Sequence, residues 1–579
     1  MTTFRVWAPR ADRVEVDLSG RRVPMRVGSQ GWHEVDVADA GPGTDYAFVL
    51  DGSDPLPDPR SPSQPCGVHA PSRLVDHTAF AWSDDGWRGF HLPSAVIYEL
   101  HVGTFSPEGT FDGAIARLDH LVDLGVTAVE LLPVAEFPGT RNWGYDGVGL
   151  FAPHHGYGGP EGLKRLVDGC HARGLAVVLD VVYNHLGPEG NYLDRFGLYF
   201  TTFYSTPWGQ AVNYDQRGSD EVRRFVIDNA ITWLRDYHVD ALRLDAVHAI
   251  VDTSAVHVLE QLATEVAELA ACENRPLWLI AESDLNDPRV VRPRDVGGYG
   301  IQAQWSDDFH HALHTVLTGE DEGYYADFGS LADLATALEE VWVYAGRRSS
   351  VRDRVHGRAP VGLPGWCFLG YLQNHDQVGN RAVGDRIGAS VSTGRLKVGA
   401  ALYLTAPFVP MVFQGEEWAA STPFQYFTSH QDPELGRLVR QGRRAEFAAF
   451  GWSAEQVPDP QEPSTFERSK LDWGELAAPP HAEVLAWYRQ LIALRRSTAG
   501  LADGRLDRVR VRFDEQARWL VVERGQLRVA VNLGETEQKV DLGEGAGACL
   551  LLASHDGIAL ESGAVTLPPD SVAISGPAR

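Results

Sequence analysis

Along the middle of this chain, short runs that are apolar at nearly every position alternate with longer runs whose apolar residues recur every three or four positions. The first pattern is typical of strands buried on both faces, and the second of helices with one buried face. Eight such strands that alternate with helices predict a (β/α)8 TIM barrel, an α/β fold closed by its last helix. The predicted strands are residues 95–102, 126–132, 176–182, 241–246, 277–281, 301–305, 367–371 and 409–413.

The helical runs support the same architecture. One follows Asp112, a predicted N-cap, and has Ile115, Leu118 and Val122 on one face. An open, doubly wound sheet is the alternative, but it would need a glycine-rich phosphate loop after its first strand, and His101-Val-Gly-Thr-Phe105 is no such loop. The other predicted helices are residues 163–173, 221–237, 256–269, 331–341, 396–404 and 484–496.

Both ends of the chain have a different pattern. Phe4 and Val6, and then Val14, Val16 and Leu18, alternate at period two, with Gly, Pro and Asp at the intervening turns. Strand-like runs return after residue 500, at 509–513, 519–523, 527–532 and 549–552. We therefore predict three domains: an N-terminal β-sandwich (1–88), the barrel (89–500) and a small C-terminal β-sandwich (501–579).

Composition excludes some partners. The 51 basic and 78 acidic residues give a net charge of −27, which repels phosphate backbones and anionic lipid. We therefore expect neither a nucleic-acid nor a membrane partner. A monomer is favoured, but the sequence leaves the oligomeric state open. The five cysteines are scattered and odd in number, and the N-terminus has no apolar leader, which favours buried reduced thiols in a cytoplasmic protein.

Candidate chemistry lies where the predicted strands end. In a barrel of this kind the active-site groups stand at the carboxyl ends of the strands. The third strand ends in Asp180-Val-Val-Tyr-Asn184-His185, and the fourth carries Arg243 and Asp245. The fifth ends in Ala281-Glu282, and the seventh in Gln373-Asn-His-Asp376. Several strands thus deliver carboxylates to one rim.

Two of these carboxyl groups have complementary surroundings. Arg243 shares a strand face with Asp245 and would keep it ionised, as a nucleophile requires, although a purely structural ion pair is the alternative. Glu282 follows an apolar strand, and desolvation there would raise its pKa toward that of a general acid. A lone Glu after a strand is more often on the surface, but its neighbours favour catalysis. One acid and one nucleophile are what glycoside hydrolysis with retention needs.

Other residues are candidates for holding a sugar. His185 and His375 could donate hydrogen bonds to hydroxyl groups, and Trp143 and Tyr145 could stack on a sugar ring or pack in the core. Asp308, His310, His311 and His314 have metal-like spacing without the Glu of a zinc site, so a polar rim is favoured and no metal is expected.

The motifs around Asp180, Asp245, Glu282 and Asp376 resemble glycoside hydrolase family 13, the α-amylase family. The resemblance implies Asp245 as nucleophile, Glu282 as acid/base and Asp376 as a third carboxylate that grips the reacting sugar. It also implies that Tyr145, His185, Arg243 and His375 line that subsite. The short segment after His185 implies no required calcium, and the N-terminal region is similar to the carbohydrate module of branching and debranching members.

Further segments resemble a subgroup of that family. They are residues 281–289, 373–381, 413–418, 423–427, 442–447 and 465–473. The implied reaction, without a cofactor, is hydrolysis of the α-1,4 bond next to the terminal trehalose of maltooligosyltrehalose. Asp284 and Asn286, with Trp143, Asp308 and Gln377, complete the expected substrate-binding residues. A branching or debranching enzyme, or a non-catalytic glycan-binding protein on the same scaffold, is the alternative.

Overall fold

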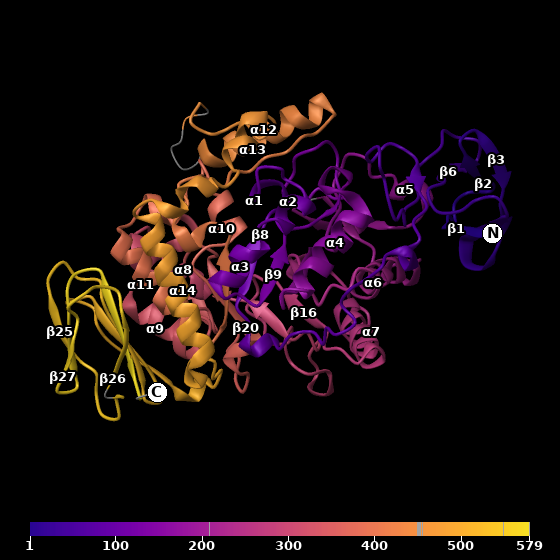
Figure 1. Cartoon of the computed structure of the whole chain (residues 1–579). Helices are drawn as coiled ribbons and strands as arrows, with labels where there is room; N and C mark the ends of the chain where they lie inside the picture. The colour runs from indigo at the N-terminus through magenta and orange to yellow at the C-terminus, as the bar shows by residue number, and fades with distance from the viewer. Residues whose placement is uncertain (208, 449–452, 454, 548, 578–579) are drawn as a thin grey trace.

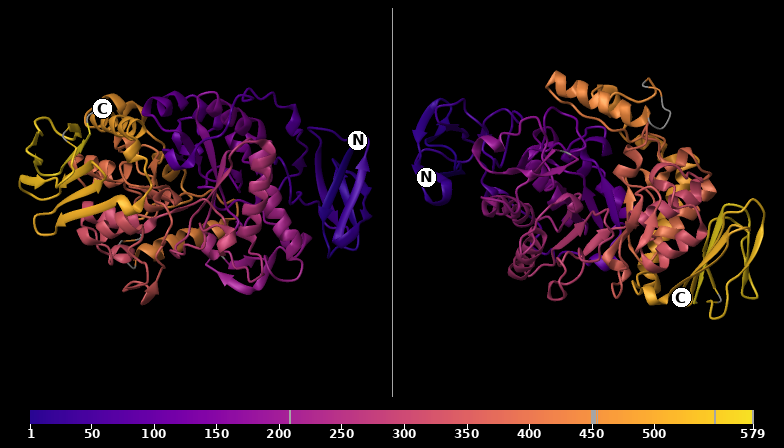
Figure 2. Two further views of the ribbon diagram at one scale, coloured as in Figure 1. Left: turned by 90° about the horizontal axis from the view of Figure 1, so that it is seen from below. Right: turned by 180° about the vertical axis from the view of Figure 1, so that it is seen from behind.

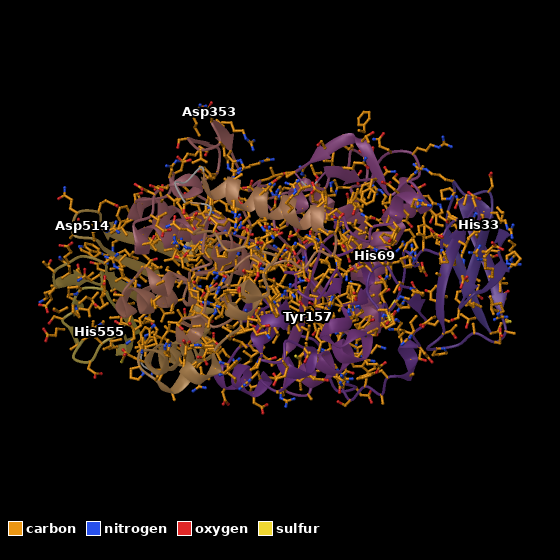
Figure 3. All side chains as sticks on the ribbon, turned by 90° about the horizontal axis from the view of Figure 1, so that it is seen from above. His33, His69, Tyr157, Asp353, Asp514 and His555 are labelled. Carbon is orange, nitrogen blue, oxygen red and sulfur yellow. The ribbon has the colours of Figure 1, made fainter. Side chains whose placement is uncertain are left out.

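The computed structural model describes residues 1–579 except 208, 449–452, 454, 548 and 578–579. Figure 1 shows three parts in a row, with the N-terminal strands at one end, the C-terminal strands at the other and the helices of the central part between them. Seen from above in Figure 3, His33 and Asp514 lie toward opposite ends of the molecule.

The central part is a closed barrel of parallel strands in the order β12-β15-β16-β17-β20-β21-β8-β9. Nearly every strand residue is buried, because the barrel interior covers one face of each strand and the helices cover the other. This confirms the (β/α)8 fold and excludes the open sheet. The strands are β8 (Ile97–Leu100), β9 (Ala128–Leu131), β12 (Ala176–Val181), β15 (Ala241–Leu244), β16 (Trp278–Ala281), β17 (Ala303–Trp305), β20 (Phe368–Tyr371) and β21 (Val409–Phe413).

The predicted helices are present, and each of their ends lies within four residues of the predicted one, some further out and some further in. They are α4 (Gly159–His171), α6 (Ser219–Asp236), α7 (Val258–Glu273), α9 (Leu331–Glu340), α11 (Thr393–Leu404) and α14 (His481–Ser497). The structure adds α1 (Val102–Phe105), α5 (Leu193–Phe196), α8 (Asp307–Thr318), α10 (His375–Gly379), α12 (Pro433–Ala448) and α13 (Pro463–Arg468).

The helix predicted after Asp112 is wrong in detail. Two helices stand there, α2 (Phe111–Ile115) and α3 (Leu118–Leu124), and Thr110 caps the first by accepting a hydrogen bond from the Gly113 amide. The break between them rotates the buried face, so Leu121 and Leu124 are buried and Val122 is exposed.

The N-terminal strands form two facing antiparallel sheets. One contains β1 (Thr2–Trp7), β5 (Trp32–Val37) and β4 (Arg26–Val27). The other contains β3 (Arg21–Pro24), β2 (Val14–Leu18), β6 (Asp45–Leu50) and β7 (Ser72–Arg73). The residues of the period-two alternation are all buried: Phe4, Val6, Val14, Val16 and Leu18. Both views in Figure 2 place these strands at one extreme of the molecule.

The C-terminal strands also form two sheets, and the sequence indicated only half of their strands. The missed ones are the three strands of the second sheet, β25, β27 and β28, and β29, which lies between β24 and β26 in the first. One sheet has β22 (Val509–Asp514), β23 (Trp519–Arg524), β24 (Leu527–Asn532), β29 (Ser571–Gly576) and β26 (Cys549–Ala553), and the other has β25 (Gln538–Asp541), β28 (Ala564–Leu567) and β27 (Leu560–Glu561). The domain boundaries at 88 and 500 remain predictions.

Hairpins and loops extend the barrel. The hairpins are β10 (Ala135–Glu136) with β11 (Gly149–Pro153), β13 (Phe200–Thr206) with β14 (Gly209–Val212), and β18 (Arg347–Ser349) with β19 (Arg354–His356). Asp353, at the tip of the last hairpin, projects beyond the body of the molecule in Figure 3.

The structure bears on two further expectations, that the cysteine thiols are buried and that the protein has no membrane partner. All five cysteines are free, but Cys66 and Cys272 are exposed and Cys549 is half-buried, so the expectation of buried thiols holds only for Cys170 and Cys367. In the described part of the chain, no helix has the length and apolar character to cross a membrane.

Candidate active site

The predicted site residues meet at one rim of the barrel. Asp180 lies in β12, Asp245 directly follows β15 and Glu282 directly follows β16. Asp376 lies in the first turn of α10, shortly after β20. Because parallel strands end at the same side of a closed barrel, these carboxyl groups face a common opening.

Arg243 connects these residues, and we call Arg243 together with Tyr145, Asp180, Asp245 and Glu282 the arginine network. Its Nη1 lies 2.7 Å from Asp180 Oδ2 and 2.7 Å from Asp245 Oδ1, and its Nη2 lies 2.8 Å from Glu282 Oε2. The Tyr145 hydroxyl is 3.4 Å from Nη1. A planar guanidinium with five fixed donors can hold several carboxylates at once, which a Lys could not do with the same geometry.

Aromatic packing fixes the guanidinium in place. The centroid of the Trp305 ring lies 4.3 Å from the guanidinium carbon of Arg243, and the Arg243 side chain is only 1% exposed. A buried cation without partners would be strongly destabilising, so the surrounding carboxylates are needed for folding as well as for chemistry.

Asp245 is held as a carboxylate. Its Oδ2 accepts a 2.6 Å hydrogen bond from the Asn184 amide, while its Oδ1 contacts Arg243. Burial alone would raise the pKa of Asp245, but Arg243, His185 and Asn184 outweigh it and hold the pKa below its ordinary value. Both oxygens are positioned and ionised, as a nucleophile requires.

Glu282 is held as a carboxylic acid. Burial raises its pKa well above the ordinary value, and the charges of Asp245 and Asp376 raise it further against the opposing effect of Arg243. The Ala246 amide donates a 2.8 Å hydrogen bond to Glu282 Oε2. Ala246 has a left-handed backbone with φ of 39°, which surrounding contacts must maintain.

Tyr145 and His375 form a stacked pair beside the arginine network. Their ring centroids are 5.3 Å apart, and the Tyr145 hydroxyl lies 2.6 Å from Asp180 Oδ2 and 2.8 Å from His375 Nε2. Glu99 receives hydrogen bonds from both the Nδ1 and the backbone amide of His375. Burial would lower the pKa of His375, but Glu99 outweighs it and raises the pKa.

His185 and Asp376 stand at the edges of the opening. His185 is buried, its Nε2 lies 3.0 Å from the Tyr145 carbonyl, and burial lowers its pKa. Asp376 accepts a 2.6 Å hydrogen bond from the Asn380 amide. Gln377 is reached by the hydroxyl of Tyr324, at 3.4 Å.

A separate set of polar groups lies beyond Glu282, and we call Asp284, Asp307 and Arg352 the outer group. Arg352 comes from the β18–β19 hairpin and makes a two-pronged pair with Asp284, in which Nη1 lies 2.9 Å from Oδ2. The side chains of Arg352 and Asp284 are 30% and 42% exposed, whereas those of the four charged members of the arginine network are 1% to 18% exposed.

Three predicted substrate-binding residues lie away from the opening. Trp143 is buried, stacks on Phe424 and donates to the Gln425 carbonyl, so it supports His375 from behind. Asn286 and Asp308 are also buried, and both contact the backbone of Tyr344. Their polar atoms are occupied by the protein itself.

Sequence reasoning missed four residues that the structure places at the site. Glu99 had a readable signal, because a carboxylate inside an apolar strand needs a partner. Tyr371, whose hydroxyl donates to Asp307, ends a predicted strand. Arg352 had no local signal, since it reaches the site from a distant hairpin. Asp307 had none either, because nothing in the sequence distinguishes it from its neighbour Asp308.

One group of described residues, Glu136, His154 and His155, has ligand atoms close enough to hold a metal ion. These atoms already have partners. His154 Nδ1 accepts from the Gly156 amide, its Nε2 faces the Gly139 carbonyl, and His155 Nδ1 lies 2.7 Å from Glu136. The group is a satisfied hydrogen-bond network beside the β10–β11 hairpin. The histidines of α8 are engaged similarly, His310 with Tyr325 and His314 with Glu320.

Comparison with known proteins finds relatives that agree with one another in family and in name. The model of the alpha amylase catalytic domain matches residues 72–208, and a domain of unknown function, DUF3459, matches residues 504–574. A malto-oligosyltrehalose trehalohydrolase of Rhizobium sp. (strain M-11) is 50% identical, with 99% of this chain and 97% of that protein covered. The protein of that name from Mycobacterium tuberculosis (strain CDC 1551 / Oshkosh) is 53% identical over 92% and 93%.

A solved structure agrees over the whole chain. The crystal structure of a Salmonella typhimurium protein assigned to the alpha amylases superimposes with a TM-score of 0.91 at 40% identity, covering 99% of this chain and 97% of that one. Pullulanase from Anoxybacillus sp. LM18-11, at 17% identity and a TM-score of 0.73, shares the fold. From these relatives, this chain belongs to the malto-oligosyltrehalose trehalohydrolases of the α-amylase family, glycoside hydrolase family 13.

Proposed function

We propose that this protein hydrolyses the α-1,4 bond between the terminal trehalose and the rest of maltooligosyltrehalose, releasing trehalose and a maltooligosaccharide. The observation that carries the proposal is Arg243, which joins a low-pKa Asp245 to a high-pKa Glu282 at the barrel rim. The names of relatives that match almost the full length supply the substrate.

In the first step, Asp245 attacks the anomeric carbon of the sugar next to trehalose. Glu282 gives its proton to the glycosidic oxygen, and the bond to trehalose breaks. The products of this step are free trehalose and a covalent glycosyl ester on Asp245, while Glu282 is left as a carboxylate.

In the second step, water replaces trehalose beside the ester. Glu282 takes a proton from the water, the hydroxyl oxygen bonds to the anomeric carbon, and the Asp245 ester bond breaks. Two displacements at one carbon retain its configuration, and Glu282 ends protonated as it began.

The geometry supports this retaining course. A nucleophile and an acid/base of a retaining enzyme stand about 5–5.5 Å apart, whereas a wider gap admits the water of an inverting one. Adjacent nitrogen atoms of the same Arg243 guanidinium contact both carboxyl groups, which favours the short separation.

The other residues would orient the sugar. Tyr145, His185, His375 and Asp376 surround the position of the reacting ring, and Asp284 lies on the side where trehalose leaves. The two chemical steps use only Asp245, Glu282 and water. That the reaction requires no metal or cofactor remains a prediction. So do a cytoplasmic location, which the free cysteines favour, and a monomeric state.

The test incubates the full chain with maltooligosyltrehalose and, separately, with amylose. Trehalose released from the first substrate supports the proposal. Substantial new α-1,6 branching of amylose, without trehalose from the first substrate, would instead indicate a branching enzyme. Asp245→Asn serves as the inactive control, because the change keeps the size of the side chain and removes its charge.

A further inference from the structure

Asp307 stands between two of the carboxyl groups already described. Strand β17 pairs with β16, which leads into Glu282, and with β20, which leads toward Asp376. Asp307 comes two residues after the end of β17, as the first residue of α8. Its neighbour Asp308 is the one that the sequence suggested, but Asp308 is buried against the Tyr344 amide.

The residues packed beneath Asp307, Trp305 and Tyr371, are part of the active site. Trp305, two residues earlier, packs on the Arg243 guanidinium and against the ring of Tyr371 at a centroid distance of 5.5 Å. The hydroxyl of Tyr371, itself fully buried, donates to Asp307 Oδ1. One oxygen of the carboxyl group is therefore fixed in orientation.

The second carboxyl oxygen of Asp307, Oδ2, is free to bind a substrate hydroxyl. Among the described residues, Asp307 Oδ2 accepts no hydrogen bond, and the side chain is only partly buried. An oxygen that the protein orients but leaves unpartnered, beside the residue that protonates the leaving group, is suited to binding a hydroxyl of that group.

We propose that Asp307 is a further substrate-contacting residue, whose Oδ2 accepts a hydrogen bond from a hydroxyl of the sugar released by Glu282. The proposal rests on the function proposed above, because the leaving sugar is there taken to be trehalose. Each trehalose hydroxyl can donate one hydrogen bond, and a carboxylate is a pure acceptor when ionised.

The charges around Asp307 give the proposal another observable. Enclosure raises the pKa of Asp307 to about 7; the Tyr371 hydrogen bond opposes this rise, and Asp376, Asp284 and Asp308 add to it. Asp307 is in turn one of the charges that raise the pKa of Glu282. Above pH 7 an ionised Asp307 therefore helps Glu282 to keep its proton, and the bound hydroxyl compensates the Asp307 charge.

The experiment compares Asp307→Asn and Asp307→Ala with the wild-type full chain, using maltooligosyltrehalose as substrate and trehalose as product inhibitor. We expect about a tenfold rise in KM and in the inhibition constant of trehalose for Asp307→Ala. For Asp307→Asn we expect the alkaline limb of the kcat/KM profile to move to lower pH, because Glu282 loses a like charge nearby.

Tyr371→Phe keeps the carboxyl group and removes only its orienting hydrogen bond, so a smaller change in the same direction is expected. It also serves if the substitutions at the start of α8 prevent folding. Unchanged KM, trehalose inhibition and alkaline limb in soluble, folded Asp307 variants would overturn the proposal. If the wild-type chain releases no trehalose, the proposed function fails instead, and that result is distinguishable because it appears before any substitution.

Discussion

The arginine network, which includes Glu282, and the outer group beyond it are built differently. In the network the side chains of Arg243 and Asp180 are 1% and 2% exposed, and all members except Tyr145 lie in a barrel strand or directly after one. In the outer group the Arg352–Asp284 pair is 30% and 42% exposed and depends on a hairpin distant in the sequence.

The comparison separates chemistry from selectivity. Charges that must be stabilised during bond cleavage benefit from a buried, preorganised setting, where electrostatic interactions are strong. Contacts that distinguish one leaving group from another can lie nearer to solvent, because each needs to supply only a modest difference in binding. We therefore expect substitutions in the network to affect kcat strongly, and substitutions in the outer group to affect KM and product selectivity.

The largest effect should come from Asp245. Asp245→Asn removes the nucleophile while keeping the hydrogen bond to Asn184 possible, and we expect kcat to fall on the order of 10⁴-fold. Steady-state release of reducing ends from maltooligosyltrehalose measures it, with circular dichroism as the folding control. Near-normal turnover would show that the nucleophile lies elsewhere.

Arg243→Met should rank second and should affect stability as well as rate. Three carboxyl groups lose their shared cation, and breaking a buried ion pair by removing one partner costs about 3–5 kcal/mol. We expect kcat to fall on the order of 10²-fold to 10³-fold. Denaturant unfolding and kinetics measure the two effects, and a variant as stable and active as the wild type would contradict the assigned role of the network.

How far the sequence predicts the site follows the same division. Asp180, Asp245 and Glu282 were predictable because a strand end fixes the position of a side chain, and the barrel brings strand ends together whatever their separation in sequence. Arg352 was not predictable, because the hairpin that carries it is placed by tertiary contacts such as the hydrogen bonds from Ser349 and Ser350 to Asp327.

The sequence also could not show which of the predicted sugar-binding side chains are buried in the core. Trp143 and Asn286 have the side chains of sugar-binding residues, but the core uses their polar atoms. The residue types and their spacing in the sequence do not tell which of the two adjacent acids, Asp307 or Asp308, is partly exposed at the site and which is buried. In the fold, the alternation predicted the barrel, whereas the break between α2 and α3, at residues 116–117, depends on how the two helices pack.

The third prediction, of an effect smaller than those of Asp245→Asn and Arg243→Met, concerns how the activity of the wild type depends on pH. Glu282 must be protonated in the first step, and its raised pKa keeps it so at neutral pH. Activity should be complete between the lowered pKa of Asp245, which must be ionised, and the raised pKa of Glu282, and should fall about tenfold per pH unit above the latter. A kcat/KM profile with maltooligosyltrehalose measures this limb, and a loss of activity already near pH 4.5, the ordinary pKa of Glu, would contradict a high-pKa acid.

Asp284→Asn should have a smaller effect and a different signature. The substitution keeps the shape of the side chain but weakens its pair with Arg352, so we expect KM to rise roughly threefold to tenfold with kcat little changed. Kinetics with maltooligosyltrehalose and with a maltooligosaccharide of equal length measure the selectivity. A fall in kcat as large as that of Arg243→Met would merge the two groups into one functional unit.

Asp353→Asn should have the smallest effect and marks the limit of the outer group. Asp353 lies next to Arg352, at the tip of the hairpin, but its side chain is 87% exposed and pairs, among the described residues, only with Arg348, which is itself 64% exposed. Asn tolerates the left-handed backbone at this position, where φ is 49°, so removal of the charge is the only substantial change. Unfolding free energy should stay within about 0.5 kcal/mol of the wild type, and KM should be unchanged. Kinetics measured beside Asp284→Asn check this directly. A rise in KM for Asp353→Asn would mean that the substrate contacts the hairpin tip, and the outer group would then extend beyond Arg352.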